Sequence, residues 1–159
     1  MPVIDSPVGP LTIRVNDDGA LEEIRFGDVG RASARPGGLK PALRSVIDQL
    51  NEYFAGKRRE FDLPLAPRGT PFQLACWNEL QRIAYGSTIS YSELARRIAK
   101  PDAVRAVGAA NGANPIPIII PCHRVIGANG TLTGYGGGLH IKRALLAIEQ
   151  PQRTLLETV

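Results

Sequence analysis

The 159-residue chain has only two cysteines and two histidines. Two thiols, Cys76 and Cys122, cannot supply the disulfide framework of a small secreted protein. So few Cys and His residues, in no ligand spacing, also argue against a metal site. No apolar run approaches the roughly 20 residues that span a bilayer, and residues 1–10 lack the basic and apolar regions of a secretory signal. We therefore expect a cytoplasmic protein without a membrane partner, a metal or a cofactor.

Acidic charge is scarce in the second part of the chain. Residues 1–66 contain nine Lys/Arg and ten Asp/Glu, whereas residues 67–159 contain ten Lys/Arg and only five Asp/Glu. Residues 66–69 (APRG) have the composition of a linker at the same place, so domains are expected at 1–66 and 67–159. A basic surplus attracts a polyanion such as DNA. A basic surface without a partner explains the charge equally well.

The first domain combines strand patterns with one helical pattern. Apolar and polar residues alternate over 11–15, and the turn sequence NDDG leads into a second strand over 20–26. Residues 27–39 have no periodicity and are expected to form a loop. Apolar positions recur at helical spacing over 41–56, and residues 61–65 are a candidate short strand.

The second domain is mainly helical in its pattern. A capping box at Thr70 begins a helix whose apolar stripe runs to Gly86; Cys76 within it is expected to be a buried structural thiol. A second capping box at Ser90 opens a short helix, and Asp102 is expected to cap a third helix that runs to residue 112. Two short helices joined by a tight turn predict a helix-turn-helix. The fold class is therefore expected to be α+β.

The third of these helices has an unusual composition, because small residues predominate from Ala106 to Gly112. Small side chains let a helix backbone approach another surface closely. That surface is either a neighbouring helix or a groove of a nucleic acid, and the composition alone does not decide between them.

The segment over residues 114–125 (NPIPIIIPCHRV) is the most informative in the chain. Its three prolines favour a stiff, extended path and its isoleucines favour burial. Cys122 thus stands at the end of a rigid segment, followed by His123 and Arg124. A nearby base or positive charge lowers a thiol pKa and produces the nucleophilic thiolate. Adjacent residues of an extended chain point to opposite faces, so a bridging water is one arrangement, and a buried structural Cys–His pair is the alternative.

The helical pattern over residues 139–150 has a carboxylate near its end. Glu149 lies at the expected C-terminus of a helix over 139–150, where the macrodipole disfavours negative charge. It therefore needs a partner, for which His123 is a good candidate, and Glu, His and Cys in this relation follow the logic of a nucleophilic triad. An exposed helix end, where the penalty is small, is the alternative. Residues 134–138 (GYGGG) lack phosphate-loop spacing, but they allow a flat ligand to approach the backbone, with Tyr135 as a stacking face.

Together these features resemble the O6-alkylguanine-DNA alkyltransferases. The likeness rests on PCHRV at 121–125, the upstream Asn114-Pro115, GYGGG at 134–138 and the final Glu149. It covers residues 68–150 strongly and residues 1–66 loosely. The resemblance implies a small ribonuclease-H-like α/β domain, followed by a mainly helical domain with a helix-turn-helix.

The resemblance also implies the chemistry. A protein of this family flips O6-alkylguanine, and by extension O4-alkylthymine, out of DNA and moves the alkyl group irreversibly onto Cys122. His123 is the base, acting through a water, and Glu149 orients it. Asn114 holds the active-site turn, and Tyr91 assists phosphate rotation and departure of the guanine.

A DNA surface and a base pocket are implied as well. Arg105 fills the gap left by the flipped nucleotide, and the small-residue helix enters the minor groove of double-stranded DNA. The residues implied at this surface are Arg105, Tyr91, Ala106, Ala109, Ala110, Asn111 and Gly112. The residues implied at the guanine pocket are Tyr135, Gly136 and Val125. A monomer is expected, and the sequence leaves open whether copies bind DNA cooperatively.

Two other classes stay open at this point. A lesion-binding protein without transfer chemistry would bind damaged DNA and remain unmodified, although the presence of Cys122 argues against it. An unrelated Cys–His hydrolase would turn over acyl substrates and ignore DNA. The range of alkyl groups accepted depends on pocket volume, which the sequence does not give.

Overall fold

A computed structural model describes residues 2–28, 32–33, 40–130, 132 and 135–150. The chain divides into two compact units, with the boundary between Arg68 and Gly69. Gly134, residues 152–159 and most of the expected loop over 27–39 lie outside the described residues. None of the helices in the described part of the chain has the length and apolar character that a membrane crossing requires.

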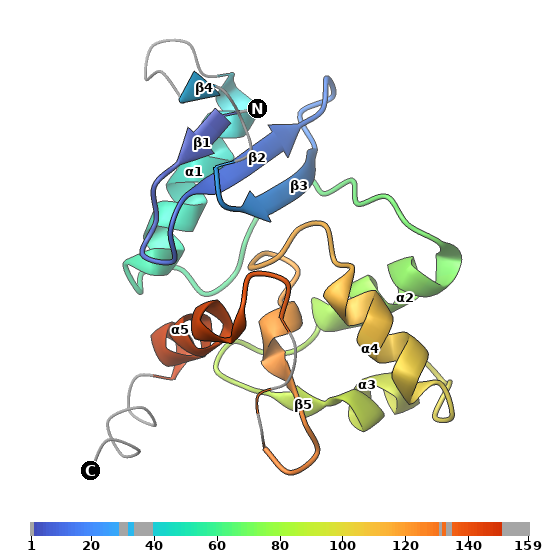
Figure 1. The fold of residues 1–159 in the computed structure, drawn as a ribbon. Helices are drawn as coiled ribbons and strands as arrows, with labels where there is room; N and C mark the ends of the chain where they lie inside the picture. The colour runs from blue at the N-terminus through green and yellow to red at the C-terminus, as the bar shows by residue number, and fades with distance from the viewer. Residues whose placement is uncertain (1, 29–31, 34–39, 131, 133–134, 151–159) are drawn as a thin grey trace, which may run out of the picture. The chain divides into compact units, whose positions relative to one another are not determined.

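The first unit contains a small sheet and one helix (Figure 1). Its elements are β1 (Pro2–Ile4), β2 (Leu11–Val15), β3 (Leu21–Phe26), β4 (Ala32–Ser33) and α1 (Pro41–Phe54). The strand order is β3-β2-β1-β4, with β2 antiparallel to both of its neighbours and β4 parallel to β1. The turn between β2 and β3 forms as its sequence predicts, because the Asn16 side chain accepts hydrogen bonds from the N–H groups of Asp18 and Ala20.

The core of the first unit is formed by apolar side chains of β2, β3 and α1. The buried apolar side chains are Leu11, Ile13, Leu21, Ile24, Val46, Leu50 and Tyr53. The sequence did not predict β1 or β4, and β4 lies inside the expected loop over 27–39. The candidate strand over 61–65 was wrong, because only Leu65 pairs there, in an isolated bridge to Leu21. Segments of two or three residues are too short to show a strand periodicity, so only their pairing partners reveal them.

The second unit is mainly helical (Figure 1). Its elements are α2 (Pro71–Leu80), β5 (Ile89–Ser90), α3 (Tyr91–Arg97), α4 (Val104–Gly112), the 3-10 turn η1 (Cys122–Arg124), β6 (Val125–Ile126) and α5 (Leu139–Glu149). Parallel pairing of β5 with β6 brings the start of α3 beside the residues that follow η1. Helix α2 is joined to α4 by Trp77, whose Nε1 donates to the Ala110 carbonyl at 2.8 Å. The expected α+β class is confirmed.

Side-chain caps begin α2 and α3 where the sequence predicts them. Thr70 accepts a hydrogen bond from the N–H of Gln73, and Ser90 accepts one from the N–H of Glu93. Helix α4 begins differently. Its N-cap is Ala103, which makes no side-chain hydrogen bond, so the prediction that Asp102 caps this helix was wrong.

Helix α2 is shorter than its apolar stripe suggests. It ends at Leu80 and residues 81–86 continue as turns, so the prediction that Gly86 ends it was wrong. In the folded protein the Ile83 carbonyl accepts a 2.7 Å hydrogen bond from Arg124. The N–H groups of Arg82 and Ile83 bond to the carbonyls three residues back, at 3.0 and 3.1 Å, so tight turns follow the helix. The Ile83 carbonyl is left without a helical partner and is available to Arg124.

Candidate active site

The proline-rich segment that leads to Cys122 is a folded turn and not the extended path that the sequence predicted. The N–H of Ile120 donates to the Ile116 carbonyl at 2.9 Å, and Ile118 between them has a φ of +75°. A β-branched residue avoids this left-handed region, so surrounding structure must hold it there. Burial does so, since Ile116, Ile118 and Ile120 are each at most 1% exposed. The thiol is carried by a rigid, strained turn.

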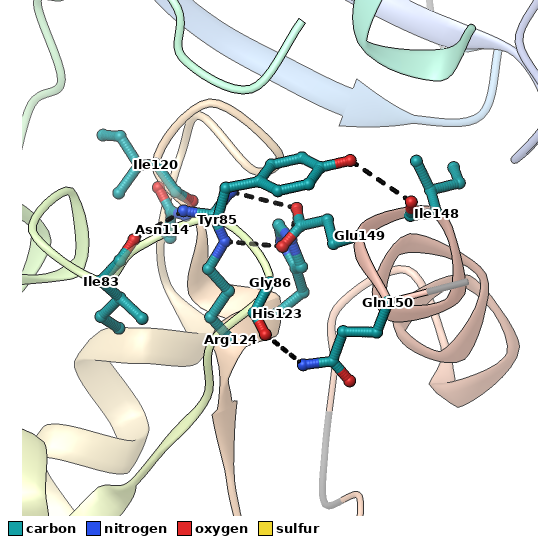
Figure 2. A network of polar contacts seen from close by, with 10 residues as sticks. All are labelled: Ile83, Tyr85, Gly86, Asn114, Ile120, His123, Arg124, Ile148, Glu149 and Gln150. Atoms are coloured by element: carbon teal, nitrogen blue, oxygen red, sulfur yellow. Dashed lines mark hydrogen bonds and ion pairs between the residues drawn. The ribbon is translucent and has the colours of Figure 1, made fainter. Parts of the chain in front are cut away.

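Asn114 spans this turn from end to end. Its Nδ2 donates to the Ile120 carbonyl at 2.7 Å (Figure 2). Its Oδ1 accepts from the N–H of Ile116 at 3.0 Å. The N–H of Cys122 donates to the same Ile120 carbonyl at 2.8 Å. One amide side chain thus fixes the Ile120 carbonyl, two residues before the cysteine.

Cys122 and His123 lie in η1, so the extended-chain argument that would place them on opposite faces does not apply. His123 is fully buried, and its ring Nε2 lies 2.7 Å from Glu149 Oε2 (Figure 2). Arg124 also pairs with this carboxylate, through Nε to Oε1 at 2.8 Å and through a terminal nitrogen to Oε2 at 3.1 Å. Glu149 is therefore shared by two consecutive residues of the turn, and the partner that its helix-end position requires is present.

The charges in this network fix the tautomer of the histidine. Burial would raise the pKa of Glu149, but hydrogen bonds and charge from His123 and Arg124 lower it to about 2. The carboxylate is thus ionised at neutral pH and can only accept, so His123 Nε2 carries the proton. Burial lowers the pKa of His123 and keeps the ring neutral. Its Nδ1 then holds the lone pair, and this atom is buried with no hydrogen-bond partner among the residues that the structure describes.

Arg124 does not serve the thiol directly, which was one of the roles considered for it. Besides Glu149 it binds the Ile83 carbonyl, and its guanidinium lies 5.7 Å from the centre of the Tyr85 ring. The Tyr85 hydroxyl in turn donates to the Ile148 carbonyl at 3.3 Å (Figure 2). The loop after α2 therefore holds the end of α5, and with it the carboxylate of Glu149.

The surroundings of Cys122 have opposite effects on the pKa of its thiol. Burial raises the pKa of its thiol, while hydrogen bonds from the Asn114 and Tyr135 side chains and the positive charge of Lys142 act to lower it. The thiol therefore needs help from its neighbours to ionise. Cys76, the other cysteine, is fully buried within α2, as predicted, and burial raises the pKa of its thiol as well.

Lys142 was missed by the sequence reasoning. It is fully buried, which is rare for lysine, and its Nζ lies 5.9 Å from the centre of the Tyr91 ring. Burial lowers the pKa of this ammonium and the charge of Cys122 raises it. A signal was available: Lys142 stands three residues before the core residue Leu145 and seven before Glu149, on the face of α5 that points inward.

Helix α4 has two distinct faces. The exposed residues include Arg105, Ala106, Ala109 and Gly112, which recur at helical spacing and leave small side chains on this face. Ala110 and Asn111, which were expected on that surface, are instead 3% and 4% exposed, so their side chains belong to the interior. Tyr91 begins α3 and is half-buried.

The three residues expected at a guanine pocket are placed differently from one another. Val125 is fully buried and follows η1 directly, while Tyr135 is half-buried and interacts with Cys122. Gly136 is exposed. Within the described ranges no group of three or more His, Cys, Asp or Glu side chains is arranged to hold a metal ion.

Comparison with known proteins covers both units. Residues 2–67 match the model of the ribonuclease-like domain of 6-O-methylguanine DNA methyltransferase, and residues 71–151 match the model of its DNA binding domain. The methylated-DNA–protein-cysteine methyltransferase of Mycobacterium tuberculosis is 51% identical over 153 residues, covering 92% of this chain and 90% of the relative. That of Methanosarcina acetivorans is 46% identical over 150 residues, covering 92% and 96%.

A solved structure agrees with this likeness. The crystal structure of Mycobacterium tuberculosis OGT in complex with DNA superposes with a TM-score of 0.84 at 50% identity, covering 95% of this chain and 92% of that one.

Proposed function

The chain belongs to the 6-O-methylguanine DNA methyltransferase family, and we propose that Cys122 is the residue on which it places the alkyl group removed from DNA. The protein is a DNA repair alkyltransferase that is consumed by its own reaction. The observation that carries the assignment of Cys122 is its position: it lies in a buried, rigid turn, directly before a histidine that an ionised Glu149 fixes.

The reaction begins with a proton leaving the Cys122 thiol. His123 Nδ1 carries the lone pair that accepts it, through a water, and the resulting imidazolium is stabilised by Glu149. The sulfur then attacks the alkyl carbon, forming an S–C bond as the C–O6 bond of the guanine breaks. The electron pair stays on the guanine, which takes a proton from the Tyr91 hydroxyl. Lys142 favours the first of these steps, because its ammonium stabilises a thiolate at Cys122.

The reaction is stoichiometric for a chemical reason. A thioether carbon is a poor target for hydrolysis, because a thiolate would have to leave from an unactivated saturated carbon. Each molecule therefore acts once. The same attack on O4-alkylthymine is proposed, because that substrate has the same alkyl–oxygen bond on a flat ring.

The exposed face of α4 is the proposed DNA surface. Its alanines and Gly112 let the helix backbone approach the minor groove of a duplex, and Arg105 beside them can occupy the space of a flipped nucleotide. Extruding a base costs a few kcal/mol, part of which an inserted cation recovers. Phosphate contacts should make the affinity depend on salt and little on sequence. We propose that the protein acts as a monomer in the cytoplasm, where reducing conditions keep Cys122 a thiol.

Restoration of guanine tests this function. The protein is mixed at several ratios with a duplex that carries a single O6-methylguanine, and the repaired base is measured by chromatography of the digested DNA. The account expects repair that stops at one guanine per protein molecule, and no repair by Cys122→Ser. Bound but unrepaired DNA would instead favour a lesion-binding protein, and turnover of acyl esters without any DNA repair would favour a hydrolase.

A further inference from the structure

Asn111 is the only polar side chain on the buried face of α4. The other buried residues of this helix, Val107 and Ala110, are apolar. Asn111 donates from Nδ2 to the carbonyl of Cys122 at 3.4 Å, while its Oδ1 is buried without a hydrogen-bond partner within the described residues. Leaving half of a buried amide unpaired costs on the order of 1–3 kcal/mol. An apolar residue of similar size would avoid that cost, so the bond to Cys122 needs an explanation.

The backbone around Cys122 supplies one. Asn114 holds the main chain before the cysteine, through the Ile120 carbonyl. Asn111 holds the peptide after it, because the Cys122 carbonyl accepts its amide as well as the N–H of Val125. Asn111 in the last turn of α4 and Asn114 two residues beyond the helix thus hold the main chain on both sides of the reactive residue.

We propose that Asn111 is a positioning residue that ties the main chain of Cys122 to the helix that meets DNA. This inference rests on the proposed function, since it takes the exposed face of α4 as the DNA surface. The helix that approaches the duplex then also sets the direction of the thiol. Asn111 acts through Cys122 and not through contact with DNA, which reverses the role that its sequence position suggested.

The test is the variant Asn111→Leu, which keeps the volume and removes the amide. Three quantities are measured: the Kd for an unmodified duplex, the single-turnover rate with an O6-methylguanine duplex, and the rate with free O6-benzylguanine base. We expect both rates to fall about tenfold, the effect of one lost positioning bond, with the Kd unchanged. The thermal midpoint should stay the same or rise, because the unpaired Oδ1 is removed. A purely structural role would lower the midpoint together with the rates.

Asn78→Leu is the matched control, since Asn78 is exposed on α2 and the chemical change is the same. Its rates should equal those of the wild type. If Asn111→Leu does not fold, Asn111→Ser replaces it, because its hydroxyl is too short to reach the Cys122 carbonyl. Unchanged rates with both substrates would overturn the proposal. So would a loss confined to duplex DNA with a weaker Kd, which would place Asn111 at the DNA itself. Failure of the wild type to repair DNA would instead contradict the proposed function.

Discussion

His123 donates its Nε2 proton to the ionised carboxylate of Glu149 across 2.7 Å, in an environment where the histidine is fully buried. This relationship assigns the lone pair of the ring to Nδ1 without reference to a substrate. It also explains why an acid can occupy the unfavourable end of α5, since Arg124 binds the same carboxylate. The network therefore stabilises the fold and, in the proposed mechanism, also prepares His123 to act on Cys122.

Replacing Glu149 with glutamine should slow the transfer reaction. The amide can still accept a hydrogen bond, but it no longer stabilises the imidazolium that forms when the thiol ionises. We expect the single-turnover rate with O6-benzylguanine to fall by orders of magnitude, up to roughly 10⁴-fold, as when the acid of a Ser-His-Asp triad is replaced by its amide. Mass spectrometry of the protein in samples quenched at successive times measures this rate. A rate equal to the wild type would show that Glu149 has only a structural task.

The stability of the protein should depend on acid pH through the same residue. Glu149 has its pKa lowered from 4.5 to about 2, so the folded state favours its ionised form. The stabilisation is complete above about pH 5 and is lost as the pH falls towards 2, with a total on the order of 3 kcal/mol. Urea unfolding at several pH values measures it.

The variant Glu149→Gln is the control for that experiment, because it has no group to titrate at this position. Its unfolding free energy should be lower at neutral pH, where Arg124 is left as a buried charge without a counterion, and should vary less between pH 5 and 2. An equal pH dependence in both proteins would assign the acid sensitivity to other carboxylates.

Lys142 should set the acidity of the reactive thiol. Its charge opposes the rise that burial causes in the pKa of Cys122, so Lys142→Met should move the thiol pKa upward and shift the pH–rate profile for iodoacetamide to higher pH. Lys142→Arg keeps the charge and should restore part of the shift. The measurement is the rate of Cys122 labelling against pH, read by peptide mass. A profile that does not move in Lys142→Met would exclude an electrostatic role.

Arg105 should matter only when a duplex has to be opened. It is exposed at the start of α4, whereas the network around Cys122 is buried. Arg105→Ala should therefore slow repair of an O6-methylguanine duplex, while the rate with free O6-benzylguanine base stays near that of the wild type. Equal slowing with both substrates would contradict the assignment of Arg105 to the gap left by the flipped base.

The sequence predicted those features that depend on local chemistry. The caps at Thr70 and Ser90, the hairpin turn at Asn16 and the need of Glu149 for a partner all arise within a few residues of chain, and the structure contains each of them. The family motif placed Cys122 and His123 together because they are neighbours in the sequence.

The remaining features depend on contacts between distant segments. The Ile83 carbonyl, just after α2, is bound by Arg124 from far along the chain. Lysine is usually a surface residue, and Lys142 becomes part of the site only because α5 packs it against Tyr91. Asn111 was expected at the DNA surface because the family resemblance implies that its helix enters the minor groove, but the phase of the helix turns it inward to Cys122.

The central claim is that Cys122 is the alkyl acceptor, and peptide mass spectrometry after reaction with an O6-methylguanine duplex tests it most directly. The chain offers its own control, since Cys76 is the only other thiol. The account predicts one methyl group on the peptide that contains Cys122, none on the peptide that contains Cys76, and normal modification in Cys76→Ser. A methyl group on Cys76, or repaired DNA with both cysteines unmodified, would contradict it.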